Sequence, residues 1–206
     1  MYDIKALYEA ENVQDAIRLL TEHPQAQIIA GGSDVLVQIR EGKRAGVELV
    51  SIYGLDELRG VSLEEDETLR IGSLTSFSHI TKNELIQKYI PILGEAVDMV
   101  GGPQIRNIGT IGGNTCNGVT SADSASTLFA LDAIIELTGP EGIRRLPIRE
   151  FYIKAGKVDI RQGELQTGIL IPKQSYQGYR GHYIKYAMRN AMDIATLGCS
   201  ANVKLS

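Results

Sequence analysis

The sequence predicts a mixed fold of helices and strands, either one two-layer domain or two small domains. The chain has 206 residues, enough for a substantial core, with 43% hydrophobic and 22% charged residues, as in ordinary soluble globular proteins. Segments whose apolar residues have the spacing of strands alternate with segments whose apolar residues lie on one face of a helix. No apolar run approaches the ~20 residues that span a bilayer, and the N-terminus lacks the layout of a signal peptide. We therefore expect a cytoplasmic protein that does not bind membranes.

Composition argues against several classes of function. The formal net charge of −4 is unlike the basic surface of a general nucleic-acid binder. Two cysteines, Cys116 and Cys199, cannot supply the four thiolates of an iron–sulfur cluster, and a disulfide scaffold is not expected at this size. The three histidines are scattered without ligand spacing, so we expect no metal site.

The first quarter of the chain alternates between strands and helices. Asn12 stands where a helix N-cap belongs, with Asp15 three residues later, and Val13, Ala16, Ile17 and Leu20 form one apolar stripe. The elements expected here are strands over 2–8, 27–30 and 47–52, and helices from 13 to about 23 and over 34–40.

Gly31, Gly32 and Ser33 separate the second of these strands from the helix that follows. A strand, a glycine turn and a helix start direct several backbone N–H groups at one point, which suits an anion. The alternative is an ordinary turn with Ser33 or Asp34 as the helix cap. The motif alone does not decide between them, and it is not the G-x-G-x-x-G of a Rossmann unit.

The rest of the chain is expected to hold a hairpin, several short helices and further strands. The hairpin pairs 61–63 with 69–71 around an acidic loop, and the last segment, 183–205, is expected to form two strands around a turn at 189–193. Its open apolar edge would be covered by a further domain or by a partner chain. Between these we expect short helices after Thr75 and Asn83, helices over 91–99 and 122–131, and strands over 133–138, 143–148 and 165–171.

The stretch from Val100 to Leu131 is the richest in glycine, with five glycines in its first fourteen residues. One explanation is a long surface loop with two turns. The other is a cradle for a phosphate-bearing ligand, in which backbone N–H groups are the donors and the absence of Cβ atoms allows close approach.

Four blocks carry a resemblance to a known family: IIAGGSDVLVQIR (28–40), QIRNIGTIGGN (104–114), SADSASTLFALDA (121–133) and ELQTGILIPK (164–173). In this order and spacing, the chain resembles the FAD-binding subunits of the molybdenum hydroxylases, the family of xanthine dehydrogenase and carbon monoxide dehydrogenase. Within that family it is most similar to the bacterial three-subunit xanthine dehydrogenases.

The resemblance implies an α+β fold with two α/β subdomains of the PCMH-like, FAD-binding type. It places the FAD-binding domain at 1–175, with subdomains at about 1–53 and 54–175. Residues 176–206 would then be the start of a truncated C-terminal domain.

The resemblance also implies the cofactor site, with FAD extended between the subdomains. Residues 28–35 would form a first loop, on the diphosphate and adenosine side, and Thr110–Asn114 a second loop, both offering backbone donors to the pyrophosphate. Lys185 would lie near the flavin ring. Asp123 and Gln166 match further contact positions, although Asp123 also suits a helix N-terminus and Lys185 an exposed strand. The implied residues are Ile28, Ile29, Ala30, Gly31, Gly32, Ser33, Asp34, Val35, Thr110, Ile111, Gly112, Gly113, Asn114, Asp123, Gln166 and Lys185.

The implied function is electron transfer rather than attack on a substrate, so no catalytic acid, base or nucleophile is expected in this chain. A molybdenum-binding subunit with molybdopterin and a subunit with 2Fe-2S clusters would complete a heterotrimer, possibly dimerised, with NAD as the acceptor. The alternatives are the FAD subunit of a carbon monoxide, nicotinate or aldehyde dehydrogenase, and a scaffold subunit that has lost FAD.

Overall fold

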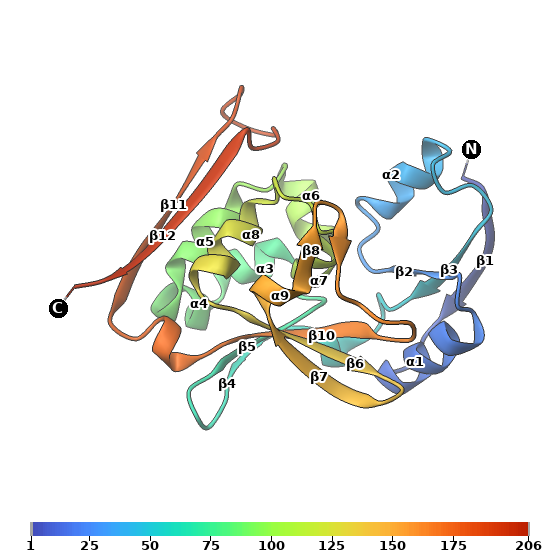
Figure 1. Ribbon diagram of the computed structural model, residues 1–206. Coiled ribbons are helices and arrows are strands. Elements are labelled where there is room, and N and C mark those ends of the chain that lie inside the picture. The colour runs from blue at the N-terminus through green and yellow to red at the C-terminus, as the bar shows by residue number, and fades with distance from the viewer. Residues whose placement is uncertain (1, 206) are drawn as a thin grey trace.

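The computed structural model describes residues 2–205, in which two sheets lie side by side and a hairpin stands at one end (Figure 1). The first sheet is parallel, in the order β1-β3-β2, and is formed by β1 (Ile4–Glu9), β2 (Gln27–Ile29) and β3 (Val47–Ser51). Helix α1 (Val13–Glu22) packs against it, and the Asn12 side chain accepts from the Asp15 N–H at 2.9 Å. The N-cap predicted at Asn12 is therefore confirmed.

The second sheet is antiparallel, and helices cover one of its faces (Figure 1). Its order is β4-β5-β10-β6-β7, so the late strand β10 inserts between two hairpins. Every residue of β10 is buried, because this central strand has neighbours on both edges and helices above it. The strands are β4 (Val61–Leu63), β5 (Leu69–Gly72), β6 (Ile134–Gly139), β7 (Gly142–Pro147) and β10 (Leu165–Ile171).

The helices over this sheet are short and capped locally. Ser76 caps α3, and the Asn83 side chain accepts from two N–H groups at the start of α4, as their sequence positions predict. These helices are α3 (Phe77–Lys82), α4 (Glu84–Tyr89), α5 (Pro91–Asp98) and α8 (Asp123–Ala130), and the first unit adds α2 (Val35–Arg40).

A shared apolar core joins the two units. Ala16 and Leu20 of α1 and Val50 of β3 pack with Leu74 and Leu165, which belong to the second unit. The rest of the second unit has its own larger core. The two units are thus held side by side by buried apolar contact, and the boundaries that we predict near residues 53 and 175 stay predictions.

The glycine-rich stretch is more helical than the sequence suggested. In place of one long loop it contains α6 (Pro103–Ile108) and α7 (Ile111–Asn117). The segment after β7 forms α9 (Ile148–Phe151), β8 (Tyr152–Lys154) and β9 (Lys157–Val158), which were not predicted. All have seven residues or fewer, which is shorter than the window over which apolar spacing identifies a helix or strand, so pattern alone misses them.

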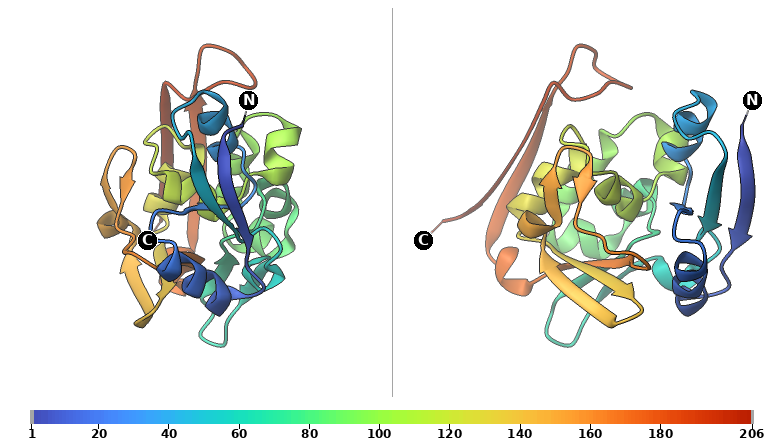
Figure 2. Two further views of the ribbon diagram at one scale, coloured as in Figure 1. Left: turned by 90° about the vertical axis from the view of Figure 1, so that its right-hand side faces the viewer. Right: turned by 45° about the vertical axis from the view of Figure 1, so that its right-hand side comes forward.

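The C-terminal hairpin lies at the opposite end of the molecule from the parallel sheet (Figure 2). Strand β11 (Tyr179–Tyr186) pairs with β12 (Leu197–Lys204), and the pair packs on α5 and α8. The two predicted strands are confirmed, although β11 begins four residues earlier than expected. Single turns of 3₁₀ helix at Asp56–Leu58 and Lys173–Ser175 complete the secondary structure. Within residues 2–205, no helix has the length and apolar character needed to cross a membrane.

Candidate functional site

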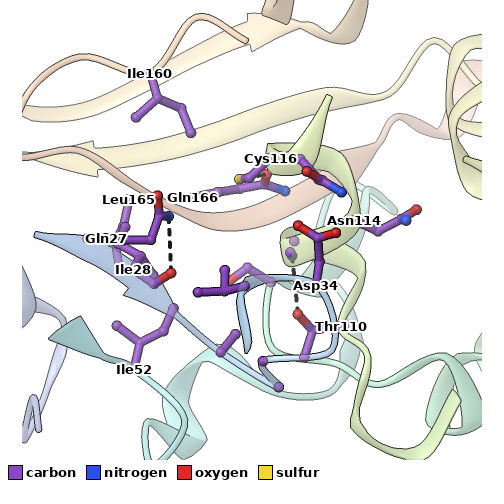
Figure 3. Close-up of a pocket in the computed structure, with 18 of the residues that line it drawn as sticks. Gln27, Ile28, Asp34, Ile52, Thr110, Asn114, Cys116, Ile160, Leu165 and Gln166 are labelled. Atoms are coloured by element: carbon purple, nitrogen blue, oxygen red, sulfur yellow. Dashed lines mark hydrogen bonds between the residues drawn. The ribbon is translucent and has the colours of Figure 1, made fainter. Parts of the chain in front are cut away.

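A cavity of about 550 Å³ lies where the first unit meets the second (Figure 3). One wall is β2 with the loop after it, another is the start of α7, and β10 contributes Leu165 and Gln166. Twelve of the sixteen residues implied by the family resemblance line this cavity: Ile28, Ala30, Gly31, Gly32, Ser33, Asp34, Val35, Thr110, Gly112, Gly113, Asn114 and Gln166.

The loop after β2 offers free backbone donors. The N–H groups of Gly31, Gly32, Ser33 and Asp34 form no hydrogen bond with any described residue. Gly32 has a φ of +72°, which glycine adopts without strain, and a Cβ on Gly31 would come 1.8 Å from the Ile108 carbonyl oxygen. Only glycine at position 31 therefore allows this loop to lie against the end of α6.

The start of α7 is built differently, and this corrects the expectation of a second donor loop. The Ile111 N–H donates to Thr75 O at 3.0 Å and the Gly112 N–H to Ser73 O at 2.8 Å. Thr110 is the N-cap, and its hydroxyl accepts from the Gly113 N–H at 3.1 Å. The usual unsatisfied donors of a helix start are thus already used inside the protein.

The two glycines of α7 face different neighbours. A Cβ on Gly112 would come 2.6 Å from Ser73 Cβ, whereas a Cβ on Gly113 would meet only Thr110 Oγ1, at 3.0 Å. Neither glycine has a positive φ. Gly112 therefore allows α7 to pack against the segment after β5, and Gly113 keeps the cavity wall free of side chain.

Gln166 lies in the buried strand β10, with its side chain beside Cys116 at the cavity wall (Figure 3). Its Oε1 accepts from the Thr115 hydroxyl at 2.8 Å, while its Nε2 is buried without a partner in the described chain. We expected this position to contact a cofactor, and the residue lies in the lining of the cavity.

Four of the implied residues do not line the cavity. Ile111 is part of the core, and Ile29 is a half-buried strand residue of β2. Asp123 and Lys185 form an ion pair at 2.9 Å between α8 and β11, with side chains 8% and 5% exposed. The Tyr183 hydroxyl donates to the same carboxylate at 2.6 Å, and burial together with this carboxylate raises the pKa of Tyr183. In this structure Asp123 and Lys185 fasten the hairpin to the helices.

Sequence reasoning missed a third wall, the segment from Ile160 to Leu165. The Arg144 guanidinium holds this wall through Glu164 Oε2 at 2.7 Å and Asp159 Oδ2 at 2.8 Å. Arg44 and Arg161 also line the cavity, together with the carboxylates of Asp34 and Glu164. Gly163, which has a φ of +79° in the structure, was a local sign of a turn in this segment.

These features fit a nucleotide cofactor that carries a pyrophosphate. Four free N–H groups in one loop suit phosphate oxygens. Ser73 Oγ and Gln166 Nε2 are buried polar atoms without partners in the described residues, and both residues line the cavity. Such atoms are costly unless a ligand or water satisfies them.

Comparison with known proteins decides the family. A protein-family model, described as the FAD binding domain in molybdopterin dehydrogenase, matches residues 2–174. The chain belongs to this family. It is 42% identical over 205 residues to the xanthine dehydrogenase FAD-binding subunit of Escherichia coli O157:H7, a match that covers 100% of this chain and 70% of the relative.

More distant members of the family share the same fold. The nicotinate dehydrogenase FAD-subunit of Eubacterium barkeri is 29% identical over 203 residues, covering 96% of this chain and 68% of the relative. A solved Cu,Mo-CO dehydrogenase, in its cyanide-inactivated form, superposes with a TM-score of 0.94 and 30% identity, over 100% of this chain and 71% of the other. The predicted resemblance and the α+β fold of the family's FAD-binding type are thus confirmed, and this chain is an FAD-binding subunit of a xanthine dehydrogenase-like oxidoreductase.

Proposed function

We propose that this chain is the electron-transfer subunit of a xanthine dehydrogenase, which receives electrons from iron–sulfur clusters of a partner subunit and passes them through FAD to NAD⁺. The observation that carries the proposal is the identity of 42% along the whole chain to a xanthine dehydrogenase FAD-binding subunit, against 29% to a nicotinate dehydrogenase FAD-subunit.

In this proposal, different walls of the cavity would contact different parts of the cofactor. The free N–H groups of residues 31–34 would hold the pyrophosphate, and Gly113 would let the cofactor approach α7 closely. The residues of this chain would bind and orient the cofactor, while bound FAD would supply the ability to exchange electrons singly or in pairs. Ile28–Val35, Thr110–Asn114, Asp123, Gln166 and Lys185 remain our proposed cofactor residues.

Asp123 and Lys185 lie outside the cavity lining and form an ion pair with each other at 2.9 Å. Lys185 also donates to the Met99 carbonyl at 3.0 Å, one residue before the cavity residue Val100. The pair would therefore also hold the segment that leads into α6.

The proposed complex contains two partners, a molybdenum-binding subunit with molybdopterin and a 2Fe-2S subunit, assembled as a heterotrimer. A complex that reduces NAD⁺ needs access to the cytoplasmic pool of this nucleotide, so we propose a cytoplasmic location. The segment 176–206 would begin a C-terminal domain, next to the FAD-binding domain at 1–175.

Co-expression with candidate partner subunits tests the proposal. We expect the purified complex to contain FAD, iron and molybdenum, and to reduce NAD⁺ when xanthine is added. The chain without partners should bind FAD but give no xanthine-dependent NAD⁺ reduction. Nicotinate, carbon monoxide or an aldehyde as the only active substrate would replace this proposal with another member of the family. A complex without any flavin would support the scaffold alternative.

A further inference from the structure

Helix α6 exposes its apolar residues and covers its charged one. None of its six described residues is fully buried, and Ile105 and Ile108 are 39% and 40% exposed. Arg106 is the one residue of this helix that is not exposed, and only 19% of its side-chain surface reaches solvent. An ordinary amphipathic helix turns apolar residues to the core and charged residues to water, so α6 has the reverse arrangement.

The Arg106 guanidinium reaches back to the turn that precedes the helix. Its Nη1 donates to Val100 O and to Gly101 O, both at 3.2 Å, and its Nε pairs with Asp98 Oδ1 at 3.3 Å. Its backbone N–H donates to Gly102 O at 3.0 Å, which closes the first turn of α6. Arg106 therefore fastens α6 to the end of α5 through main-chain carbonyl groups, in place of buried apolar contact.

Two cations thus serve three consecutive carbonyl groups at the end of α5. Lys185 Nζ donates to Met99 O at 3.0 Å, and Arg106 serves the next two. Carbonyl groups at the C-terminal end of a helix carry partial negative charge, so positive side chains stabilise them. Gly101 has a φ of +49°, which glycine adopts without strain. Two cations and one glycine therefore fix the turn that leads into α6.

Several parts of the cavity depend on where this turn and α6 lie. Val100 and Ile105 both line the cavity. Ile108 O supports the loop after β2, because a Cβ on Gly31 would lie only 1.8 Å from it. Helix α6 lies on the side of the second unit that faces the first unit (Figure 1). A shift of α6 would therefore move two lining residues and the support of the loop that offers donors at 31–34.

We propose that Arg106 is a positioning residue for the cofactor, which fixes α6 and through it the shape of the FAD cavity. The inference rests on the proposed FAD site and adds a residue that is not part of the cavity lining. Arg106 acts through the carbonyl groups of residues 100 and 101, and α6 then places Ile105 and Ile108. Bound FAD would cover the exposed Ile105 side chain, so cofactor binding and the order of α6 would strengthen each other.

Affinity for FAD in the cofactor-free chain, measured by titration calorimetry, is the first test. Arg106→Met keeps an unbranched apolar stem and removes the donors, and it should weaken FAD binding about tenfold. Arg106→Lys keeps a positive donor that can serve one carbonyl group, and it should weaken binding about threefold. Partial rescue by lysine depends on a charged donor rather than on bulk, so the order of the three affinities separates the carbonyl contacts from packing.

Arg149→Met is the matched control, because Arg149 also serves the end of a helix but does not line the cavity. Its Nη2 donates to Phe129 O of α8 at 3.3 Å and pairs with Asp132 at 3.1 Å. This variant should leave FAD affinity unchanged. Asp98→Asn tests the ion pair of Arg106 by itself. The Asp98 side chain is 56% exposed, so this change should weaken binding less than about twofold.

Hydrogen exchange of backbone amides supplies a measurement that does not need the cofactor. In cofactor-free Arg106→Met, amides of residues 104–109 should exchange about fivefold faster than in the wild type, while those of α8 stay unchanged. Addition of FAD to the wild type should slow exchange in the same segment. A residue that serves only overall stability would instead speed exchange in α8 as well and lower the Tm with it.

Unchanged FAD affinity in a folded Arg106→Met would overturn the inference, and so would an equal loss in Arg149→Met or in Asp98→Asn. Faster exchange that extends to α8 would overturn it too. If the wild-type chain fails to bind FAD, the proposed function fails, and exchange at 104–109 in the cofactor-free chain still shows whether Arg106 holds α6. If the wild type and Arg106→Met bind FAD equally, the inference about Arg106 fails alone.

Discussion

The two glycine pairs at the cavity, Gly31-Gly32 and Gly112-Gly113, look alike in sequence and differ in structure. The first pair lies in a loop whose N–H groups are free from position 31 to position 34. The second pair lies in the first turn of α7, where the Ser73 carbonyl accepts from the Gly112 N–H and the Thr110 hydroxyl from the Gly113 N–H.

The difference shows that glycine at a cofactor cavity can have two distinct purposes. In the loop, the lack of a Cβ permits a backbone that exposes donors. In α7, it permits two close approaches, one to Ser73 and one to whatever occupies the cavity. The predictions for Gly31, Gly112 and Gly113 below test these two purposes.

Gly31→Ala should have the largest effect. Its Cβ would lie 1.8 Å from the Ile108 carbonyl oxygen, so the loop or α6 has to move. We expect a loss of about 2–3 kcal/mol in unfolding free energy, as for a severe overpacking, and FAD affinity reduced more than tenfold. Urea unfolding and FAD titration measure the two effects.

Gly54→Ala is the matched control, since a Cβ there meets nothing within 4 Å and its φ is not positive. It should change stability by less than about 0.5 kcal/mol. Equal behaviour of the two variants would show that the loop does not depend on its contact with Ile108.

Gly112→Ala and Gly113→Ala should separate packing from cofactor approach. Gly112→Ala brings a Cβ within 2.7 Å of Ser73 O and should lower stability by about 1–2 kcal/mol. Gly113→Ala should leave stability unchanged or slightly higher, as alanine favours helices, but reduce FAD affinity.

Gly113→Val should abolish FAD retention by its bulk alone. Thermal unfolding without FAD and flavin content after purification measure the two effects. Full flavin content in Gly113→Val would contradict a close approach at this position.

Thr110→Val should have a smaller effect, confined to the helix start. It removes the hydroxyl that accepts from the Gly113 N–H and should destabilise the chain by about 1 kcal/mol. Thr110→Ser keeps the acceptor and should behave as the wild type in chemical unfolding. If Thr110→Ser loses as much stability as Thr110→Val, the methyl group rather than the cap is the stabilising part.

The ion pair of Glu164 in the third wall should make the stability of the protein depend on pH in the acid range. Burial alone would raise the pKa of Glu164, but hydrogen bonds from Arg144 and from the Arg161 N–H hold it below its usual value of 4.5. A lowered folded-state pKa adds stability that is fully present above about pH 4.5 and is lost as the pH falls below it.

Unfolding free energy measured from pH 7 to pH 3 should therefore show a loss below about pH 4.5 that Glu164→Gln reduces. Glu136, held between Arg70 and Arg145, also has a lowered pKa and should contribute a loss that Glu164→Gln leaves in place. If Glu164→Gln leaves the pH dependence of the unfolding free energy unchanged, Glu164 does not contribute to the loss of stability in acid.

The sequence by itself determined the features that depend on neighbours along the chain. The caps at Asn12 and Asn83 bind N–H groups two or three residues ahead, and the paired strands β4 and β5 follow from alternation and a polar loop. The position of the cavity residues in the glycine blocks was likewise predictable, because the resemblance to the family covers those blocks.

Only the tertiary structure decided which donors are free and which charges are paired. The N–H groups of α7 are used up by Ser73 and Thr75, which the sheet brings beside a helix that begins at Ile111. Asp123 pairs with Lys185 across 62 residues, because the hairpin folds back on α8. Hydrogen bonds and ion pairs between distant segments depend on how the sheets and helices pack, and no local pattern of residues encodes that packing.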